Sequence, residues 1–600
     1  MCAINGFNFK DEGLILKMNL ATRHRGPDGA GIFLDDKISL GHNRLSIIDL
    51  SDAAKQPMES GDERLIIVFN GEIYNFKELK KELANFYNFK TLSDTEVILA
   101  AYKKWGPEAV KKLNGIFAFA IWDKEKRELF LARDPIGVKP LYYFLGQNKF
   151  VFSSEIKAIL EHDVPRILDR GAFNHYLRVL YTPAPHTMFE GIYKFPAAHY
   201  GVLSAKDGSG ELKLMKYWDI DKVEYFNAPL KKIAEDLRGE VLKAVKRQLI
   251  SDRPIGLYLS GGIDSSAVLD AMREARSNID TFSVGFTLPN KSDEEKFNQD
   301  FYLARRTAKY YGTNHHEILL SEDDASEYFE KTIYQLDEPI ANPTAIPMMK
   351  LAEFTKSKWV DVVLGGDGGD ELFGGYERYR LSRALNYVPG ASLVLPEGVR
   401  KFARFMFQKD PVLREVMSDQ FFDRNISYSF FTEHYFKSNP FKTFEELFMS
   451  VDRRTWLVDE SLMRTDKMSM SSAVEARVPL LDKDLIEFAA RVPLKYKVGL
   501  FDKKIILKEA FRGRIPDFLL NQPKRGWFSP GAKWLRNPKI RAAAEHILSR
   551  DYYNETAPIF NWANIDKILK DHVEGRKYNF NVLWSILSFQ VWAKIYKVKI

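Results

Sequence analysis

Two unlike hydrophobic patterns divide the chain. Up to about residue 200, short runs of alternating apolar residues are separated by Gly, Asp and Asn, as in 116–122 and 129–131. Such alternation predicts strands with one face toward a core, here joined by a turn at 123–127. Helical periodicity in this part is confined chiefly to 75–84 and 94–104. The pattern predicts an α+β first half with antiparallel sheets layered with helices.

From about residue 228, strand-like and helical runs alternate. In chain order they are a helix at 230–250, a strand at 254–262, a helix at 265–277, a strand at 281–286 and a helix at 303–312. This order predicts an α/β domain built on a parallel sheet. Beyond about residue 375, aromatic residues and helix formers predict a helical extension.

A Gly/Ser/Asp turn between two β-like segments falls within 203–218. We therefore expect a first domain over 2–205, a linker over 206–227 and a second domain over 228–600.

Composition narrows the class of protein without changing this picture. The chain has 600 residues, 88 basic and 81 acidic, and a net charge of +7, too small a surplus to indicate nucleic acid or membrane as a partner. No apolar run approaches the roughly 18 residues of a membrane span, and the N-terminal segment lacks the regions of a signal peptide. The single cysteine, at position 2, excludes an internal disulfide. We expect a cytoplasmic protein.

The segment 259–266, LSGGIDSS, runs from a predicted strand into a predicted helix. Glycines allow close approach to an anion, and the start of a helix supplies free N–H groups and a positive dipole end. Ser260, Ser265 and Ser266 add hydroxyl groups. The segment lacks the lysine of a P-loop. Taken alone, SGG indicates only a tight turn; followed by IDSS it predicts a phosphate-binding turn.

A second glycine-rich segment, LGGDGGDELFGGY at 364–376, follows an apolar run expected to be a strand at 359–364. Asp367, Asp370 and Glu371 supply oxygen ligands suited to Mg²⁺ near phosphates, without the spacing of an EF-hand. A solvated Gly/Asp turn is the simpler alternative. Because the carboxyl ends of parallel strands share one edge of a sheet, both segments are expected to face one nucleotide.

The second half resembles the synthetase domain of glutamine-dependent asparagine synthetases. SGGIDSS is similar to the pyrophosphate loop of ATP-pyrophosphatases, and GDGGDELFGGY and LMRTDKMSMSSAVEARVPLLD (462–482) extend the likeness. The resemblance implies ATP and Mg²⁺, with Mg²⁺ on Asp264 and Asp370 and a catalytic lysine at Lys524. The implied ATP-binding residues are Leu259, Ser260, Gly261, Gly262, Asp264, Ser265, Ser266, Val284, Gly365, Gly366 and Lys504.

The second motif departs from the family pattern. The family has Ser-Gly-Glu where this chain has Gly365-Gly366-Asp367. Asp367 is the expected catalytic carboxylate, but its shorter side chain weakens a direct transfer of the glutamate's role. Free aspartate is the expected acceptor, and another carboxylate, such as a cell-wall or surface-sugar acid, is the alternative.

The position of the cysteine gives it a chemical role. Removal of Met1 would place Cys2 at the N-terminus, where an α-amine of pKa about 7.7–8.0 can accept the thiol proton. The segments CAINGF, RHRGPDGAG, HNRLSIID, FNGEIYN, SDTE, LNGIFAFAIWD and ARDPIGVKPLYY resemble class II glutamine amidotransferases of the N-terminal-nucleophile fold. The resemblance implies catalysis by Cys2, with Asn70 and Gly71 as the oxyanion hole. The implied glutamine-binding residues are Arg44, Ile48, Asn70, Glu72 and Asp94.

Together the halves predict an ATP-dependent carbon–nitrogen ligase. Glutamine would be hydrolysed at Cys2, a carboxylate adenylated in the second half, and ammonia passed through an internal tunnel. The resemblance is also compatible with a homodimer. A regulatory module with dead sites would lack Cys2, Asn70 or the aspartates, all of which are present. A glutaminase feeding a sugar acceptor would lack SGGIDSS.

Overall fold

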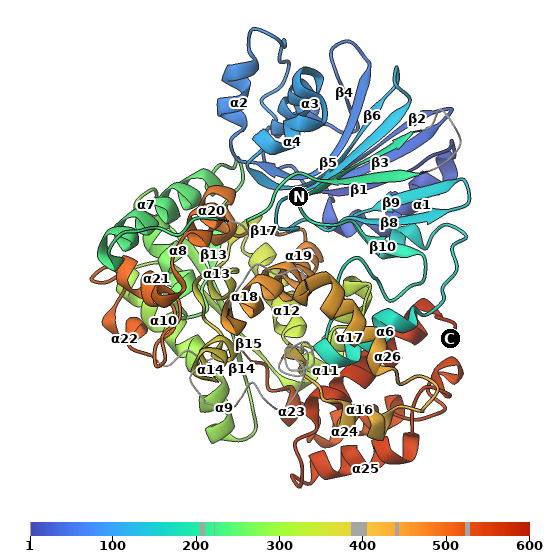
Figure 1. Ribbon diagram of the computed structural model, residues 1–600, viewed down its shortest axis with the longest axis vertical. Coiled ribbons are helices and arrows are strands. Elements are labelled where there is room, and N and C mark those ends of the chain that lie inside the picture. Colours follow the sequence, from blue (N-terminus) through green and yellow to red (C-terminus); the bar gives the residue numbers. More distant parts are fainter. Residues whose placement is uncertain (1, 205–210, 221–222, 386–404, 438–442, 523–527) are drawn as a thin grey trace.

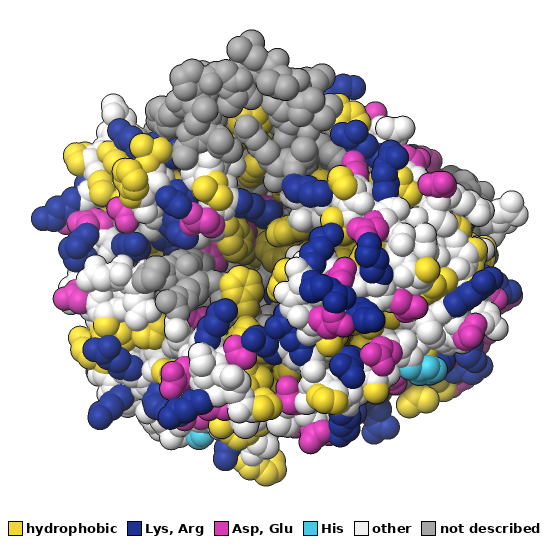
Figure 2. Space-filling model, turned by 90° about the horizontal axis from the view of Figure 1, so that it is seen from below, with side chains coloured by type: hydrophobic (Ala, Val, Ile, Leu, Met, Phe, Trp, Pro, Cys, Tyr) yellow, Lys and Arg dark blue, Asp and Glu magenta, His cyan; other side chains and the backbone are white. Residues whose placement is uncertain are grey.

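The computed structural model describes residues 2–204, 211–220, 223–385, 405–437, 443–522 and 528–600. Its two halves are stacked in Figure 1, with the antiparallel sheets of the first half above the parallel sheet and helices of the second. Strand β1 begins at the level where the halves meet. Among the described residues, no helix has both the length and the apolar character needed to cross a membrane. Figure 2 shows basic and acidic side chains interspersed over one face of the molecule.

The first half consists of two six-stranded antiparallel sheets. The first has the order β10-β8-β9-β1-β3-β2 and the second β12-β11-β7-β6-β5-β4. The strands of the first sheet are β1 (Ala3–Phe7), β2 (Gly29–Asp35), β3 (Ile38–Arg44), β8 (Tyr142–Gly146), β9 (Lys149–Ser153) and β10 (Ile192–Lys194). Those of the second are β4 (Met58–Glu59), β5 (Leu65–Ile73), β6 (Gly115–Asp123), β7 (Glu128–Arg133), β11 (His199–Ser204) and β12 (Leu212–Lys216).

Apolar side chains of the two sheets pack against each other between them, including Leu40 and Phe152 from the first and Val68 and Leu131 from the second. Helices α1 (Glu12–Ala21) and α5 (Ile156–Ile159) pack on the outer face of the first sheet. Helices α2 (Phe76–Leu83), α3 (Asp94–Trp105) and α4 (Ala109–Lys112) cover the outer face of the second. The predicted strands and turn around 116–131 and both predicted helices are confirmed, because the alternation of apolar residues matches burial on sheet faces.

The second half is built on a five-stranded parallel sheet of order β15-β14-β13-β16-β17. Its strands are β13 (Ile255–Tyr258), β14 (Asp280–Phe286), β15 (Asn314–Leu320), β16 (Val362–Leu364) and β17 (Glu475–Arg477). One face packs on α7 (Leu230–Gln248), α8 (Ile263–Arg273), α10 (Gln299–Tyr311) and α20 (Lys483–Ala490). The other packs on α11 (Glu322–Leu336) and α12 (Ala345–Ser357). The predicted α/β domain is confirmed.

The apolar run expected as a strand at 359–364 is a strand only over its second half. Trp359 has φ 62° and is 84% exposed, so the chain still turns out of α12 at this residue. β16 therefore begins at Val362. Strand β12 lies in the segment expected as a linker and pairs antiparallel with β11, so the second sheet uses residues up to Lys216.

The expected helical extension is present. It includes α14 (Glu377–Leu385), α16 (Asp410–Val416), α17 (Arg424–Phe431), α18 (Phe444–Arg454), α19 (Met463–Met470), α21 (Ile505–Ala510), α22 (Asp517–Leu520), α23 (Gly531–Trp534), α24 (Pro538–Ile547), α25 (Trp562–Val573) and α26 (Phe580–Tyr596). Helix α26 is apolar around its whole circumference, which is typical of a fully buried helix.

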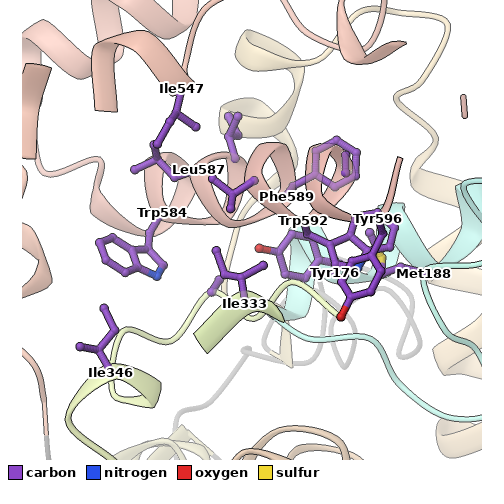
Figure 3. Packing of buried hydrophobic residues seen from close by; sticks show 14 of the residues in the cluster. Tyr176, Met188, Ile333, Ile346, Ile547, Trp584, Leu587, Phe589, Trp592 and Tyr596 are labelled. Carbon is purple, nitrogen blue, oxygen red and sulfur yellow. The ribbon is translucent and has the colours of Figure 1, made fainter. Parts of the chain in front are cut away.

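The C-terminal helix joins the two halves. Figure 3 shows Trp584, Leu587, Phe589 and Trp592 of α26 among residues from several other elements. On one side, the hydroxyl of Tyr176 in α6 (Arg170–Val179), a helix of the first half, donates to the carbonyl of Ser585 at 2.9 Å. On another, the indole of Trp592 donates to the carbonyl of Asp337 at 2.7 Å. The two halves therefore share one continuous core.

Candidate functional site

Cys2 lies directly before β1, between the two sheets and beside β5. It is buried, and its backbone nitrogen donates to Oδ1 of Asn70 at 3.1 Å. The Nδ2 atom of Asn70 is buried and has no hydrogen-bond partner among the described residues. Burial raises the pKa of the Cys2 thiol, so ionisation of this thiol requires a base. The side chain that the Cys2 nitrogen contacts therefore keeps an unpartnered amide donor.

Gly71 follows Asn70 in β5 with φ 150°. A Cβ atom at this position would lie 2.0 Å from the carbonyl oxygen of Ile116 on the neighbouring strand. Only glycine fits without a backbone shift, so this residue sets the path of the strand beside Cys2.

The expected glutamine-binding residues surround one pocket. This pocket, which is open to solvent, is lined by Cys2 together with Arg44, Leu45, Ser46, Ile47, Ile48, Ala54, Gln56, Phe69, Gly71, Glu72, Ser93, Asp94 and Thr95. Asn70 joins this set through its hydrogen bond to Cys2. The structure thus brings together every residue expected in the first site.

The charged groups of the pocket are held in fixed positions. The guanidinium of Arg44 donates to the carbonyls of Asp49 and Ser51 at 2.5 and 2.9 Å. Oδ2 of Asp94 accepts from the backbone N–H of Ile73 at 2.9 Å, and burial raises the pKa of Asp94 to about 6. Burial, with Glu475 and Asp94 nearby, raises the pKa of Glu72 well above its usual value. The pocket therefore offers one fixed cation, together with buried carboxylates whose ionised form a cationic ligand would stabilise.

Arg25 was not singled out from the sequence, although it belongs to the RHRGPDGAG segment. Its Nε atom donates to the carbonyl of Cys2 at 3.1 Å. Its other nitrogens form ion pairs with Glu155 at 3.1 Å and with Asp466 of α19 at 2.8 Å, all buried. The side chain of Arg25 thus links Asp466, in the second half, to the backbone of Cys2.

Arg477, in the EAR tripeptide that forms β17, was also given no role from the sequence. Its Nη2 atom lies 3.7 Å from Glu72, which lines the first pocket, and its Nε atom donates to Glu475 at 2.5 Å. Its backbone carbonyl accepts from the N–H of Gly365 at 2.8 Å. One residue therefore contacts both the first pocket and the second glycine-rich segment.

The first glycine-rich segment forms the turn between β13 and α8. Gly261 has φ 70°, and a Cβ atom there would lie 2.4 Å from the carbonyl oxygen of Asp300. Gly262 precedes α8 and has no side chain to cap the first N–H groups of the helix. The hydroxyls of Ser265 and Ser266 donate to the carbonyl of Gly262 at 3.3 and 2.8 Å. The helix N-terminus is thus left open to an anion.

The second glycine-rich segment packs directly on the first. A Cβ atom on Gly366 would lie 2.7 Å from the backbone nitrogen of Ser265, and one on Gly369 would lie 2.4 Å from Oδ1 of Asp264. The buried ammonium of Lys504 pairs with Asp264 and, at 2.6 Å, with Asp370. Both expected metal ligands and the expected basic residue are therefore in one place.

The remaining predicted residues are placed as follows. Leu259 is buried and hydrogen-bonds to the carbonyl of Phe282, and Val284 lies in the adjacent strand β14. The carboxylate of Asp367 accepts from the hydroxyls of Ser461 and Thr465 at 3.4 and 3.3 Å. Lys524 lies outside the described residues.

The residues present fit a magnesium ion bound together with phosphates. Asp264 and Asp370 approach a single ammonium, and carboxylate oxygens are the ligands that Mg²⁺ prefers. In the described ranges, no group of three or more His, Cys, Asp or Glu could hold a metal. Magnesium is commonly bound by one or two carboxylates, with substrate phosphates supplying further ligands.

Comparison with known proteins assigns a family to each half of the chain. The asparagine synthase family model matches residues 236–594, and the glutamine amidotransferase domain model matches residues 1–218. The chain is 33% identical to an asparagine synthetase [glutamine-hydrolyzing] 1 of Bacillus subtilis, over 97% of this chain and 94% of that protein. It is 29% identical to the amidase chry2 of Gibberella zeae, over 88% of this chain and 87% of that protein.

The first model covers more than half of the chain, and the bacterial relative aligns over nearly all of it. The chain belongs to the asparagine synthase family, with a glutamine amidotransferase domain ahead of the asparagine synthase domain.

Proposed function

We propose that the protein is a glutamine-dependent asparagine synthetase acting in the cytoplasm. The reaction is ATP + L-aspartate + L-glutamine + water giving L-asparagine + L-glutamate + AMP + pyrophosphate. The supporting observation is the contact between the Cys2 nitrogen and Asn70, in a pocket that also contains the expected glutamine-binding residues.

In the first half, the Cys2 thiol attacks the side-chain amide of glutamine. Once Met1 is removed, the Cys2 nitrogen is an α-amine, and it takes the thiol proton and passes it to the departing ammonia. The unpartnered Nδ2 of Asn70 donates to the oxygen that becomes negative, together with the backbone N–H of Gly71. Water then hydrolyses the thioester to glutamate.

Charge complementarity orients glutamine in this pocket. The fixed guanidinium of Arg44 pairs with the α-carboxylate, and Asp94 and Glu72 pair with the α-ammonium. Burial raises the pKa of both carboxyl groups, and for Glu72 it outweighs the nearby Arg477, so a cationic ligand recovers part of that cost. Ile48 supplies an apolar wall.

In the second half, the open N-terminus of α8 and the hydroxyls of Ser260, Ser265 and Ser266 hold the pyrophosphate portion of ATP. Asp264 and Asp370 would hold Mg²⁺, which neutralises phosphate charge when bound. Lys504 then moves from the aspartates toward the phosphates. Lys524 and Asp367 act at the acceptor carboxylate, which attacks the α-phosphorus and releases pyrophosphate. Ammonia replaces AMP on the acyl-adenylate.

The test separates the two sites. Cys2→Ala is expected to abolish glutamine-dependent product while ammonium salts still support it. Asn70→Ala is the companion variant, expected to retain the thiol and lose glutaminase activity by a factor of 10² or more. Equal loss of activity with both nitrogen donors in Cys2→Ala would refute the two-site mechanism.

One observation favours a second candidate acceptor. Asp367 stands where the family pattern has glutamate, and its carboxylate is drawn onto Ser461 and Thr465. A shorter, retracted carboxylate leaves space for a carboxylic acid other than aspartate. A panel of carboxylates with ATP and ammonium, scored by AMP release and product mass, decides between the two. Turnover of aspartate below that of another acid would overturn the first choice.

A further inference from the structure

A second cavity, which is open to solvent, lies away from both sites described above. It is lined by Ile220, Val223, Tyr225, Glu446, Met449, Arg453, Ala490, Val492, Leu494 and Lys497. Three parts of the chain build it: described residues of the stretch from Ile220 to Tyr225, helix α18 and the chain that follows α20. Glu446, Met449 and Arg453 are spaced to share one face of α18, which is turned to the cavity.

Described residues on either side of Ile220, Val223 and Tyr225 are anchored by contacts to α20 and the residue after it. The N–H of Phe226 donates to the carbonyl of Arg491 at 2.8 Å. The ring of Phe226 packs on Phe488 of α20, with centroids 4.8 Å apart, and the guanidinium of Arg491 lies over it. The indole of Trp218 donates to Glu487 at 2.8 Å. The cavity is thus held by contacts outside it.

Lys497 is the unusual group in this cavity. The residue is only 6% exposed, and its ammonium makes no hydrogen bond or ion pair with any described residue. Burial lowers the pKa of Lys497 to about 7; the positive charge of Arg453 acts in the same direction and the negative charge of Glu446 opposes it. Buried charges in proteins are usually paired, so an unpaired ammonium lining a cavity indicates that an anion belongs there.

The other lining groups define which anion fits. Glu446 already accepts from the hydroxyl of Tyr225 at 3.1 Å, so one carboxylate is engaged at the rim. Arg453 and Lys497 supply two cationic groups. The remaining walls are apolar side chains, which a fully hydrated anion such as phosphate would leave unmatched. A planar carboxylate carried on an apolar body matches both parts.

We propose that this cavity binds a small organic carboxylate with an aliphatic body, with Lys497 as its cationic partner. The site is separate from the ATP site but close to it in the chain. The carbonyl of Lys497 accepts from the N–H of Ile505 at 3.3 Å, directly after the lysine that pairs with Asp264 and Asp370.

The probe is hexanoate, with hexanamide as its uncharged match and inorganic phosphate as a hydrated anion. Binding to the full chain is measured by calorimetry without ATP or glutamine. Wild type is expected to bind hexanoate at pH 6.5, and the affinity is expected to fall about tenfold per pH unit above pH 7 as Lys497 loses its proton. The other charged or titratable groups facing it are Glu446, Arg453 and Tyr225, and burial raises the pKa of Tyr225 to about 12, well above this pH range.

Lys497→Met is expected to weaken hexanoate binding at least tenfold, and removal of an unpaired buried ammonium is not expected to unfold the chain. Lys495→Met, at an exposed lysine two residues away, is the matched control and is expected to bind like wild type. The proposal is overturned if wild type fails to bind hexanoate at pH 6.5, if hexanamide or phosphate binds as tightly, or if Lys497→Met retains the affinity.

Discussion

Asp94→Asn is expected to stabilise the folded chain while removing glutamine binding. The carboxyl group of Asp94 is buried at the start of α3, and its Oδ2 atom accepts from the backbone N–H of Ile73. Burial raises the pKa of Asp94 from 3.8 to about 6, which corresponds to about 3 kcal/mol in favour of the protonated form. Asparagine has the same shape and keeps an oxygen for the N–H of Ile73.

The sign of the pH dependence follows from this shift. The folded state holds the Asp94 proton more tightly than the unfolded state does, so this residue lowers the free energy of unfolding as pH rises from about 4 to about 6. Above pH 6 the full free-energy cost of burying the ionised Asp94 carboxylate is present. Asp94→Asn is therefore expected to raise the transition temperature of the first domain by several degrees at pH 7.5, and by less at pH 5.

Calorimetry of the full chain at the two pH values measures this effect. Asp62→Asn is the control of opposite sign, because the bond to Lys103 lowers the pKa of Asp62 to about 2. That variant is expected to lower or leave unchanged the transition temperature at pH 7.5. In activity assays, Asp94→Asn is expected to lose glutamine-dependent turnover by about 30-fold or more while ammonium-dependent turnover persists. A lower transition temperature for Asp94→Asn, or an equal gain at pH 5 and 7.5, would refute the reasoning.

Four further variants test other parts of the structure. Gly71→Ala places a Cβ against a neighbouring carbonyl and is expected to reduce glutaminase activity at least about 10²-fold, with ammonium-dependent product formation as the readout that should survive. Asp264→Asn and Lys504→Met are each expected to abolish AMP release and spare glutaminase activity; AMP formation at the wild-type rate by either would contradict the assignment. Burial raises the pKa of Glu371 to about 7, so Glu371→Gln is expected to raise thermal stability at pH 8 more than at pH 5.5, and the reverse order would count against it.

Much of the fold could be predicted because it is encoded by local periodicity. Alternation of apolar residues between 116 and 131 predicts β6 and β7, and glycines mark the turns that follow β13 and β16. Local signals are less accurate at element ends: the apolar run from Trp359 gave too long a strand, because a left-handed residue at the end of a helix has no distinct hydrophobic pattern. β12 was likewise placed in a linker, since its pairing with β11 depends on the sheet.

The candidate sites divide in the same way. Glycine positions and the carboxylates beside them can be found in sequence, because close backbone approach to a neighbour demands a missing side chain. The distant residues that contact those sites cannot be found in this way. Arg25 meets Asp466, and Arg477 meets Glu72, across hundreds of residues. Nothing in the neighbouring sequence of either arginine identifies its partner.

By itself, the sequence determined the elements, the two glycine-rich turns and the placement of the only cysteine at residue 2, because each follows from spacing along the chain. The tertiary structure decided that the backbone nitrogen of Cys2 lies on Asn70, that one arginine spans the first pocket and the second glycine-rich segment, and that Lys497 is buried without a partner among the described residues. These features depend on how separate elements pack. Packing brings together residues with no fixed separation in sequence, so only the folded chain reveals them.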